Sequence, residues 1–305
     1  MRIFVTGASG WIGSAVVPEL LGVGHEVVGL ARSEAAAQRL EEAGAIVQRG
    51  DLDDPEGLAD AAAHSEGVVH LAFQHDVAFG GGFAAAGAAD RRAVEAMGAA
   101  LAQSDRPFVL ASGMMGLASG RVSTEDDGLV LSAEARTHPA AVRAATALLA
   151  LSLAGTGVRS SVLRFPPTVH GEGDNGFVAT LVGIARQRGV AGYVGDGANR
   201  WPAVHRLDAA RLVRLAVESA PSGSVLHAVA DEGVAFREIA EVIGRHAGVP
   251  ATSVAPADVA GHFGFLGRMV ALDVPASAAI TRGLLGWVPS GPSLLEDLER
   301  DHYFR

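Results

Sequence analysis

Short runs of β-branched and other apolar residues recur along the first half of the chain, separated by alanine-rich stretches with helical spacing. The runs are apolar on both faces, which is typical of parallel strands covered by helices on either side. We therefore expect an α/β fold with a doubly wound parallel sheet. The expected strands are residues 3–5, 26–30, 45–47, 67–72, 108–111 and 161–165.

The pattern changes after Phe165, where long loops rich in proline and glycine replace the alternation. Loops of this kind often carry function. A helix is expected after Ala235, in the stretch FREIAEVIGRHAG. We expect a smaller domain to cover the carboxyl edge of the sheet, where open α/β folds bind ligands. The expected division is 1–165, completed by about 204–230, for the sheet domain, and 166–203 with 231–305 for the smaller domain.

Composition excludes several classes of protein. A chain of 305 residues with 49% hydrophobic and 19% charged residues suits an ordered protein of about two structural units. The net charge of −10 and the lack of a basic stripe argue against a nucleic-acid partner. The chain has no cysteine, so it has no disulfide, thiolate nucleophile or cysteine zinc site.

No apolar run approaches the roughly 20 residues of a membrane span. A strand starting at Arg2 leaves no room for a leader, so we expect a cytoplasmic protein.

The first expected strand runs into VTGASGWIG, which places three glycines three residues apart between a strand and a helix. Such a turn brings backbone N–H groups close to a pyrophosphate, and the helix N-terminus adds a favourable partial charge. A glycine turn made only for close packing is the alternative, but the strand before it and the helix after it favour a dinucleotide site of the Rossmann type. The residues expected to contact the cofactor here are Gly7, Ser9, Gly10, Trp11, Ile12 and Gly13.

The second and third strands indicate which dinucleotide binds. Arg32 follows the second strand, where a site specific for NAD usually has an acidic residue for the ribose 2′-hydroxyl. An arginine suits a 2′-phosphate, so NADP(H) is the expected cofactor and NAD(H) remains possible; a solvated surface arginine is the alternative. Asp51 follows the third strand and could accept from the adenine amine, although aspartate is also common in turns.

Six segments of the chain resemble, in the same order, the extended branch of the short-chain dehydrogenases/reductases, a family that includes sugar-nucleotide epimerases and dihydroflavonol-type reductases. They are TGASGWIG (6–13), GDL (50–52), VVHLA (68–72), FVLASG (108–113), LRFPPTVHG (163–171) and VHRLDAARL (204–212). The resemblance implies a Rossmann domain, a smaller C-terminal substrate domain and a nicotinamide cofactor. Further cofactor contacts implied by it are Leu52, Leu71, Ala72, Phe73, Arg143 and Pro166.

In that family a serine, a tyrosine and a lysine perform the reaction, with the tyrosine and lysine four residues apart on one helix. The resemblance puts Arg143 at the lysine position and Pro139 at the tyrosine position. Only Tyr193 and Tyr303 exist in the chain, and neither precedes a basic residue by four. Gly113 occupies the usual serine position, and Ser112 lies one residue earlier.

Because a guanidinium does not deprotonate in proteins, another group must donate the proton. Histidine is the natural candidate, since its ordinary pKa is near neutral. His138 precedes the proline that opens the expected helix, and His75 follows the fourth strand. Each could instead be a surface or hydrogen-bonded histidine. The catalytic candidates are His138, Arg143, Ser112 and His75. No histidine–carboxylate pattern typical of a metal site is present, so no metal is expected.

The substrate contacts expected from the loops are Met114, His170, Asn199, Trp201 and His205. The loop NRWPAVH combines donors, a flat ring and a histidine, which suits a polar or aromatic small molecule. A Trp-Pro packing element is the alternative. The expected function is an NADP-dependent oxidoreductase acting on a carbonyl/alcohol pair. A nucleotide-sugar epimerase or dehydratase and a dinucleotide-binding sensor without turnover are the alternatives.

A homodimer is also expected. The helix predicted at 140–154 is apolar nearly all round, which is more than one buried face requires. The resemblance implies that this helix pairs with the helix near 89–102 across a two-fold axis.

Overall fold

The computed structural model describes residues 1–117, 119–128 and 139–305. Its main sheet has seven parallel strands in the order β10-β6-β5-β4-β1-β2-β3. These strands are β1 (Arg2–Thr6), β2 (Glu26–Ala31), β3 (Ile46–Arg49), β4 (Gly67–His70), β5 (Pro107–Gly113), β6 (Arg159–Phe165) and β10 (Ser224–His227). The expected doubly wound parallel sheet of the Rossmann type is therefore confirmed, and the expected strands match within a few residues.

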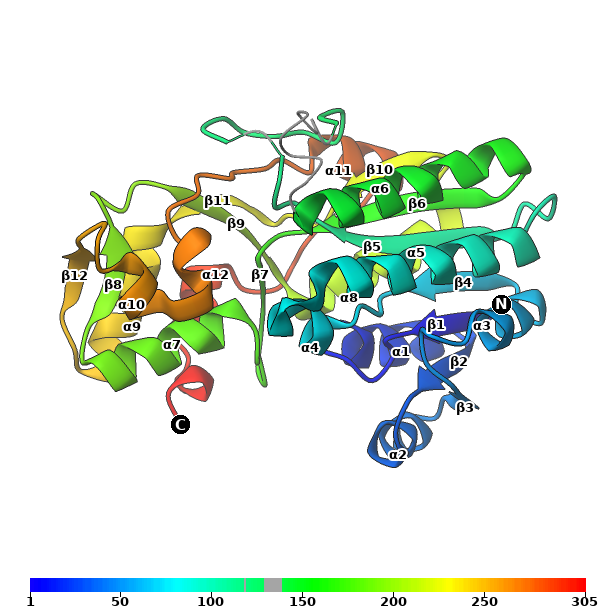
Figure 1. Ribbon diagram of the computed structural model, residues 1–305, viewed down its shortest axis with the longest axis horizontal. Coiled ribbons are helices and arrows are strands. Elements are labelled where there is room, and N and C mark those ends of the chain that lie inside the picture. Colours follow the sequence, from blue (N-terminus) through cyan, green and yellow to red (C-terminus); the bar gives the residue numbers. More distant parts are fainter. Residues whose placement is uncertain (118, 129–138) are drawn as a thin grey trace.

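Helices cover both faces of this sheet (Figure 1). Alternation along β1 explains the two layers, because Ile3 and Val5 belong to one core and Phe4 to the other. The first core takes α1 (Gly13–Gly22), α2 (Glu34–Glu42) and α8 (Arg206–Ser219); the second takes α3 (Pro55–Ala63), α5 (Phe83–Ala100) and α6 (Pro139–Ser152). None of the described helices is both long enough and apolar enough to cross a bilayer.

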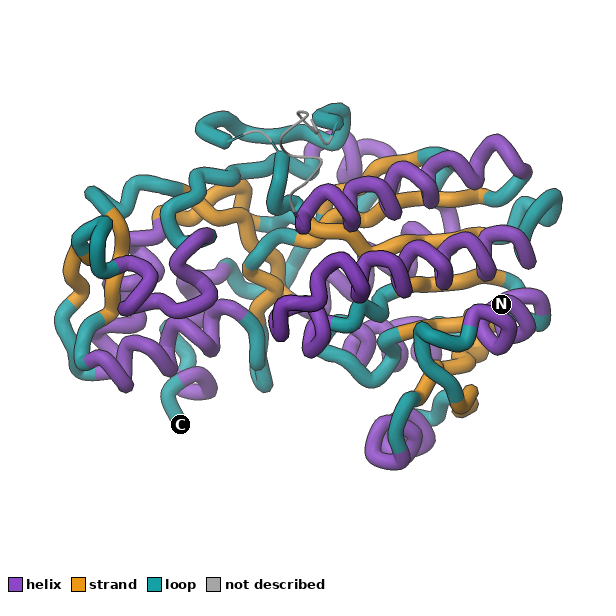
Figure 2. The backbone as a smooth tube through the Cα atoms, in the orientation of Figure 1, coloured by secondary structure: helices purple, strands orange, loops and turns teal. Residues whose placement is uncertain are grey.

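The smaller domain lies beyond the carboxyl edge of the main sheet (Figure 2). Its strands form two small sheets, β11-β9-β7 and β12-β8. They are β7 (Thr168–His170), β8 (Ala191–Val194), β9 (Arg200–His205), β11 (Asp231–Ala235) and β12 (Ala251–Val254). Its helices are α7 (Phe177–Arg188), α9 (Phe236–Ala247), α10 (Val259–Phe263) and α12 (Leu294–Leu298). The helix expected after Ala235 is α9.

Several short elements connect these layers. They are α4 (His75–Val77), the π-helical turn η1 (Ala78–Gly82), the 3₁₀ turns η3 (Leu153–Thr156), η4 (Gly264–Arg268) and η5 (Asp301–Tyr303), and α11 (Ala279–Leu285). Of these, α4 and η1 lead from the end of β4 into α5.

The segment from Ala276 to Trp287 departs from the expected division of the chain. Ala276, Ala278 and Trp287 are fully buried in the core of the main sheet. The Trp287 indole donates to the Asp208 carbonyl in α8, at 3.1 Å. The assignment of all of 231–305 to the smaller domain is therefore wrong for this segment, because the chain returns to the large domain without a proline- or glycine-rich linker.

The last residues of the chain hydrogen-bond to the segment of the smaller domain that follows β7. The Tyr303 hydroxyl accepts from the Gly171 N–H at 3.1 Å and donates to Asp174 at 3.0 Å. Burial, followed by the charge of Asp174, raises the pKa of Tyr303 well above its ordinary value. Tyr303 is thus a structural tyrosine that keeps its proton.

We expect Trp201→Ala to lower the free energy of unfolding by about 3–5 kcal/mol in urea, because the side chain is 0% exposed and truncation leaves a large cavity. The ring of Trp201 packs against those of Phe177 and Phe236. Val288→Ala is the control, since Val288 is 70% exposed and should change stability by less than about 0.5 kcal/mol. A loss below about 1 kcal/mol for Trp201→Ala would contradict the packing role.

Candidate active site

The glycine turn after β1 is tight for steric reasons. Gly7 has φ +67, and a Cβ there would lie 2.8 Å from the backbone nitrogen of Ala72. A Cβ at Gly13 would lie 2.1 Å from the Gly7 carbonyl oxygen, and the Gly10 N–H donates to that oxygen at 2.9 Å. The turn therefore delivers the N-terminus of α1, whose first N–H groups have no partner within the helix, to the carboxyl edge of the sheet. These residues fit the pyrophosphate of a dinucleotide.

Two residues of this turn use their side chains elsewhere. The Trp11 indole donates to the Val169 carbonyl at 2.8 Å, and the Arg206 guanidinium lies 4.1 Å from the centre of the Trp11 ring. Trp11 therefore ties the turn to β7 and α8 and offers the cofactor only its backbone. Ile12 precedes α1 and packs against the core of the large domain, so its backbone is likewise the part that faces a ligand.

A buried hydrogen-bond chain runs directly beneath the turn. Thr6 Oγ1 lies 2.6 Å from His70 Nδ1, and His70 Nε2 lies 3.1 Å from Asp90 Oδ1. The Ala72 N–H donates to Thr6 Oγ1 at 3.2 Å. A carboxylate only accepts, so His70 Nε2 donates to Asp90, and His70 Nδ1 shares the second hydrogen bond with the Thr6 hydroxyl. All three side chains are fully buried, and the sequence analysis did not identify them.

Arg143 occupies the centre of the site. Its guanidinium donates to the Ala111 carbonyl at 2.8 Å and lies 4.2 Å from the centre of the Phe73 ring. Burial lowers the pKa of Arg143, and the negative charge of Asp90 acts in the opposite direction. A guanidinium stays charged in proteins. Arg143 therefore places a positive charge where β4 and β5 end.

His75 lies beside Arg143, at the start of α4. The residue is exposed, but Phe73 and Phe79 flank its ring, with ring centres 5.1 Å and 5.7 Å away. Burial by these rings, followed by the charge of Arg143, lowers the pKa of His75 below 6.5. This is the direction expected from like-charge repulsion. The other histidine candidate, His138, lies outside the described residues.

The end of β5 offers fewer side chains to a ligand than the sequence predicts. Ser112 is buried, and Gly113 is open enough that a Cβ would meet nothing within 4 Å. Met114 is fully buried in the core of the large domain. The expectation that Met114 contacts substrate is therefore wrong, because its side chain packs inward. Pro166, at the end of β6, is buried beside Phe165.

The adenosine end of the site is exposed. Arg32 donates to Asp76 at 2.8 Å, and both side chains face solvent. Asp51 accepts from the Asp53 N–H at 2.8 Å, which is the turn chemistry given as its alternative. Leu52 is buried in the second core of the large domain, whereas Leu71 and Ala72 are half-buried where β4 ends.

Two of the expected substrate residues, Asn199 just before β9 and Trp201 within it, hold the smaller domain together. Trp201 is fully buried, so its ring cannot contact substrate and the packing alternative applies. The Asn199 amide donates to the carbonyls of Val270 and Leu272, at 2.9 Å and 3.2 Å. It thereby anchors the segment that follows η4.

The two remaining histidines lie apart from Arg143. His170 is fully buried and its Nδ1 lies 2.9 Å from Asp297, so the expectation that it contacts substrate is wrong. His205 precedes α8, and its Nδ1 accepts from the Leu207 N–H at 3.4 Å. His205 also lines an open, charged cleft of about 530 Å³ at the C-terminus, together with Glu172, Arg206, Leu207, Asp297, Arg300, Asp301, His302 and Arg305.

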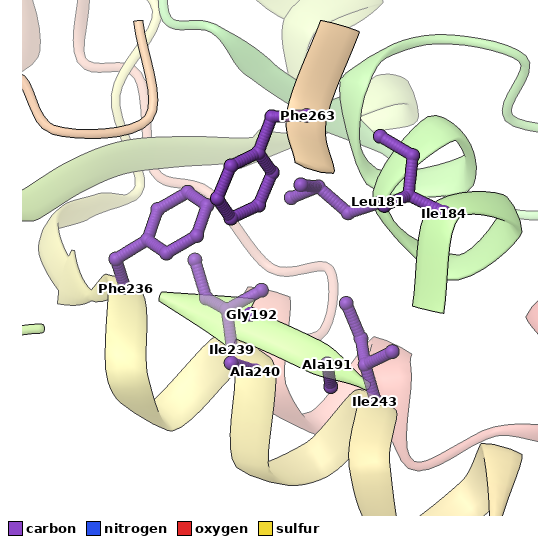
Figure 3. Close-up of a pocket in the computed structure, with 9 residues that line it drawn as sticks. All are labelled: Leu181, Ile184, Ala191, Gly192, Phe236, Ile239, Ala240, Ile243 and Phe263. Carbon is purple, nitrogen blue, oxygen red and sulfur yellow. The ribbon is translucent and has the colours of Figure 1, made fainter. Parts of the chain in front are cut away.

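A second cavity lies inside the smaller domain and measures about 10 Å³. Figure 3 shows apolar side chains around it, including Phe236, Phe263 and Leu181. It is too small and too apolar for a substrate. Within residues 1–117, 119–128 and 139–305, no group of three or more acidic or histidine side chains could hold a metal ion.

A family model, "NAD dependent epimerase/dehydratase family", matches residues 3–228, which include the glycine turn and Arg143. The chain belongs to this family. The chain is 43% identical over 305 residues to an uncharacterized protein of Schizosaccharomyces pombe, covering 100% of each. It is also 43% identical over 304 residues to an uncharacterized protein of Saccharomyces cerevisiae, covering 99% of each.

Among solved structures, this epimerase/dehydratase-family chain is similar to a dTDP-glucose 4,6-dehydratase of Streptomyces venezuelae with NAD bound. The TM-score is 0.78 at 21% identity, over 99% of this chain and 96% of that one. This likeness concerns the fold. The resemblance that the sequence motifs implied is confirmed by the family match.

We expect Gly13→Ala to weaken NADPH binding by at least about tenfold, because a Cβ 2.1 Å from the Gly7 oxygen forces the turn open. Titration calorimetry measures the affinity, and thermal melting checks that the protein is folded. Gly22→Ala, at the other end of α1, is the matched control, since a Cβ there meets nothing within 4 Å. Equal affinities for the two variants would refute the assignment of the turn.

Proposed function

We propose that this member of the family is an NADP(H)-dependent oxidoreductase that interconverts a carbonyl and an alcohol on a small organic substrate. The observation that carries the proposal is the juxtaposition of a half-buried cation and a histidine, Arg143 and His75, on the Phe73 ring where β4 ends. The glycine turn opens at the same edge of the sheet. When bound, the nicotinamide supplies or accepts the hydride.

Arg143 and His75 have different roles in the proposed reaction. Hydride addition to a carbonyl carbon leaves a negative oxygen, which the fixed charge of Arg143 stabilises. His75 donates its proton to that oxygen and becomes neutral, and solvent then reprotonates the exposed imidazole. Because Arg143 also lowers the pKa of His75, the imidazolium is a stronger acid than an isolated one.

This assignment predicts a pH dependence. His75 must carry its proton to act as the acid, so carbonyl reduction should decline as pH rises through a pKa below 6.5. His75→Ala should lower kcat by about 100- to 10,000-fold and remove that step from the pH profile. The measurement is NADPH oxidation between pH 5 and 8, in the range where histidines titrate.

Two further variants make the test specific. His138→Ala examines the alternative donor, and His64→Ala is a control because His64 is exposed at the end of α3. If His75→Ala retains the wild-type profile while His138→Ala loses it, the proton passes through His138. If neither variant changes turnover, the histidine assignment fails.

Arg32 supports NADP(H) over NAD(H). A 2′-phosphate would replace Asp76 as its partner, and an exposed ion pair contributes little to stability. Charge-assisted bonds to phosphate contribute about 1.5–3 kcal/mol each, so NADPH should bind about tenfold or more tightly than NADH. Arg32→Ala should remove this preference and Asp76→Asn should increase it, measured by calorimetry. Equal affinities of the wild type for both cofactors would contradict the proposal.

A cofactor-binding protein without turnover is the second candidate, favoured by Pro139 at the tyrosine position. Neither Tyr193 in β8 nor Tyr303 in η5 is linked to the Arg143 contacts. The deciding experiment offers NADPH-loaded protein a panel of carbonyl compounds. Oxidation of NADPH by any of them supports the oxidoreductase. Its absence across the panel leaves the sensor and nucleotide-sugar epimerisation, which causes no net NADPH oxidation, and conversion of an added nucleotide sugar to its epimer distinguishes these two.

A further inference from the structure

A continuous line of aromatic rings leads away from Arg143 toward the smaller domain. It passes from Phe73 to His75, Phe79, Phe265 and Phe177, and we call these five residues the aromatic strip. The ring centres are 5.1 Å apart for Phe73–His75, 5.7 Å for His75–Phe79, 5.7 Å for Phe79–Phe265 and 6.4 Å for Phe265–Phe177. These spacings lie within the range of favourable ring contacts.

The middle of the strip joins the two domains. Phe79 belongs to η1, which follows β4 of the large domain, and Phe265 belongs to η4 of the smaller domain. In Figure 1, α4 and the start of α5 lie at the end of the main sheet nearest the smaller domain. The Phe79–Phe265 contact therefore bridges the gap between the domains on the side where Arg143 and His75 lie.

Both bridging rings are open to solvent. Phe79 is 59% exposed and Phe265 is 55% exposed, and they are the only exposed ones among the eleven phenylalanines, all of which are described. Exposure of two adjacent large rings is unfavourable by about 25 cal/mol per Å² of apolar surface. Contiguous exposed apolar surface commonly marks a binding site.

The backbone at each ring is irregular. Phe79 lies in a π-helical turn followed by Gly80, Gly81 and Gly82, and Gly81 has φ +98. Phe265 follows Gly264, which has φ +57. Single π-helical turns occur often at functional sites. Left-handed glycines on both sides of the gap thus set the turns that present the two rings.

Charged side chains are present at the inner end of the strip. Arg143 lies over Phe73, and Asp76, next to His75, is paired with Arg32. Beyond His75 the strip itself presents only phenylalanine rings. A sugar cannot hydrogen-bond to these ring faces, whereas a flat ring system can stack on them.

We infer that the aromatic strip binds the non-reacting part of the substrate, and that the substrate is a planar aromatic aldehyde, ketone or the corresponding alcohol. This inference rests on the proposed carbonyl/alcohol chemistry. The carbonyl oxygen lies at the inner end of the strip, within reach of His75 and Arg143, and the ring system stacks on the exposed faces of Phe79 and Phe265. Aromatic stacking then selects the substrate.

The first test compares three aldehydes: 2-naphthaldehyde, cyclohexanecarboxaldehyde and glyceraldehyde. The wild type should reduce 2-naphthaldehyde with the highest kcat/KM. Phe79→Ala and Phe265→Ala should each lower the ratio of kcat/KM for 2-naphthaldehyde to kcat/KM for glyceraldehyde by about 2- to 12-fold, the range of one ring contact. Leu284→Ala is the control, because Leu284 is 44% exposed on α11. Equal kcat/KM for the three aldehydes, with no effect of either phenylalanine variant, would overturn the inference.

The second test separates this inference from the proposed function. 2-Naphthamide, which has no reducible aldehyde, is titrated into the NADP⁺-loaded protein. 2-Naphthamide should bind the wild type and Leu284→Ala more tightly than it binds Phe79→Ala and Phe265→Ala. This result supports the aromatic strip even if no aldehyde is reduced. In that case only the proposed function fails. If the aldehydes are reduced but naphthamide binds all four proteins equally, the proposed function stands and the aromatic strip is refuted.

Discussion

The hydrogen-bond chain Thr6–His70–Asp90 is the interaction on which the geometry of the site depends. It joins β1, β4 and α5 inside the large domain, and through the Ala72 N–H it fixes the loop against which Gly7 packs. It has little freedom to change, because loss of one member leaves a buried donor or acceptor unpaired, at about 1–3 kcal/mol. The same chain places the Asp90 charge near Arg143, where it offsets part of the effect of burial on that guanidinium.

An arginine at the centre of the site can take fewer roles in proton transfer than a lysine at the same position. A lysine can lose its proton when buried, whereas a guanidinium keeps its charge and holds a planar set of donors. One donor of Arg143 is used by the Ala111 carbonyl, and the flat face lies on Phe73. Arg143 is therefore a fixed positive charge, and in the proposed reaction the mobile proton comes from its neighbour His75. The Trp11 indole on the Val169 carbonyl and the Arg206 guanidinium over the Trp11 ring hold the glycine turn to β7 and α8 from the other side.

The fold could be predicted from the sequence because parallel strands buried on both faces are apolar throughout, and a strand, three spaced glycines and a helix leave few alternatives. His75 could be found because it follows the fourth strand, and Arg143 because the resemblance puts it at the lysine position of the family. Trp201, His170 and Met114 were misassigned, since their burial depends on packing between segments far apart in the chain. His70 left a usable signal as a polar residue within the apolar run GVVHLA, whereas Asp90 stands beside Arg91 and Arg92 and left none. The Phe79–Phe265 contact left none, because it joins positions 186 residues apart.

The chain passes between the two domains more than once, and this has a consequence for protein synthesis. The main sheet receives its edge strand β10 only after β7, β8 and β9 have been made, and its core is completed by Trp287. The smaller domain in turn needs Tyr303, two residues before the last, to bind Gly171 and Asp174. On the ribosome, where domains usually fold from the N-terminus onward, the large domain cannot complete its core until Trp287 has been made, and the smaller domain must wait for Tyr303. The strands that are made first therefore remain without their edge strand β10 through most of synthesis.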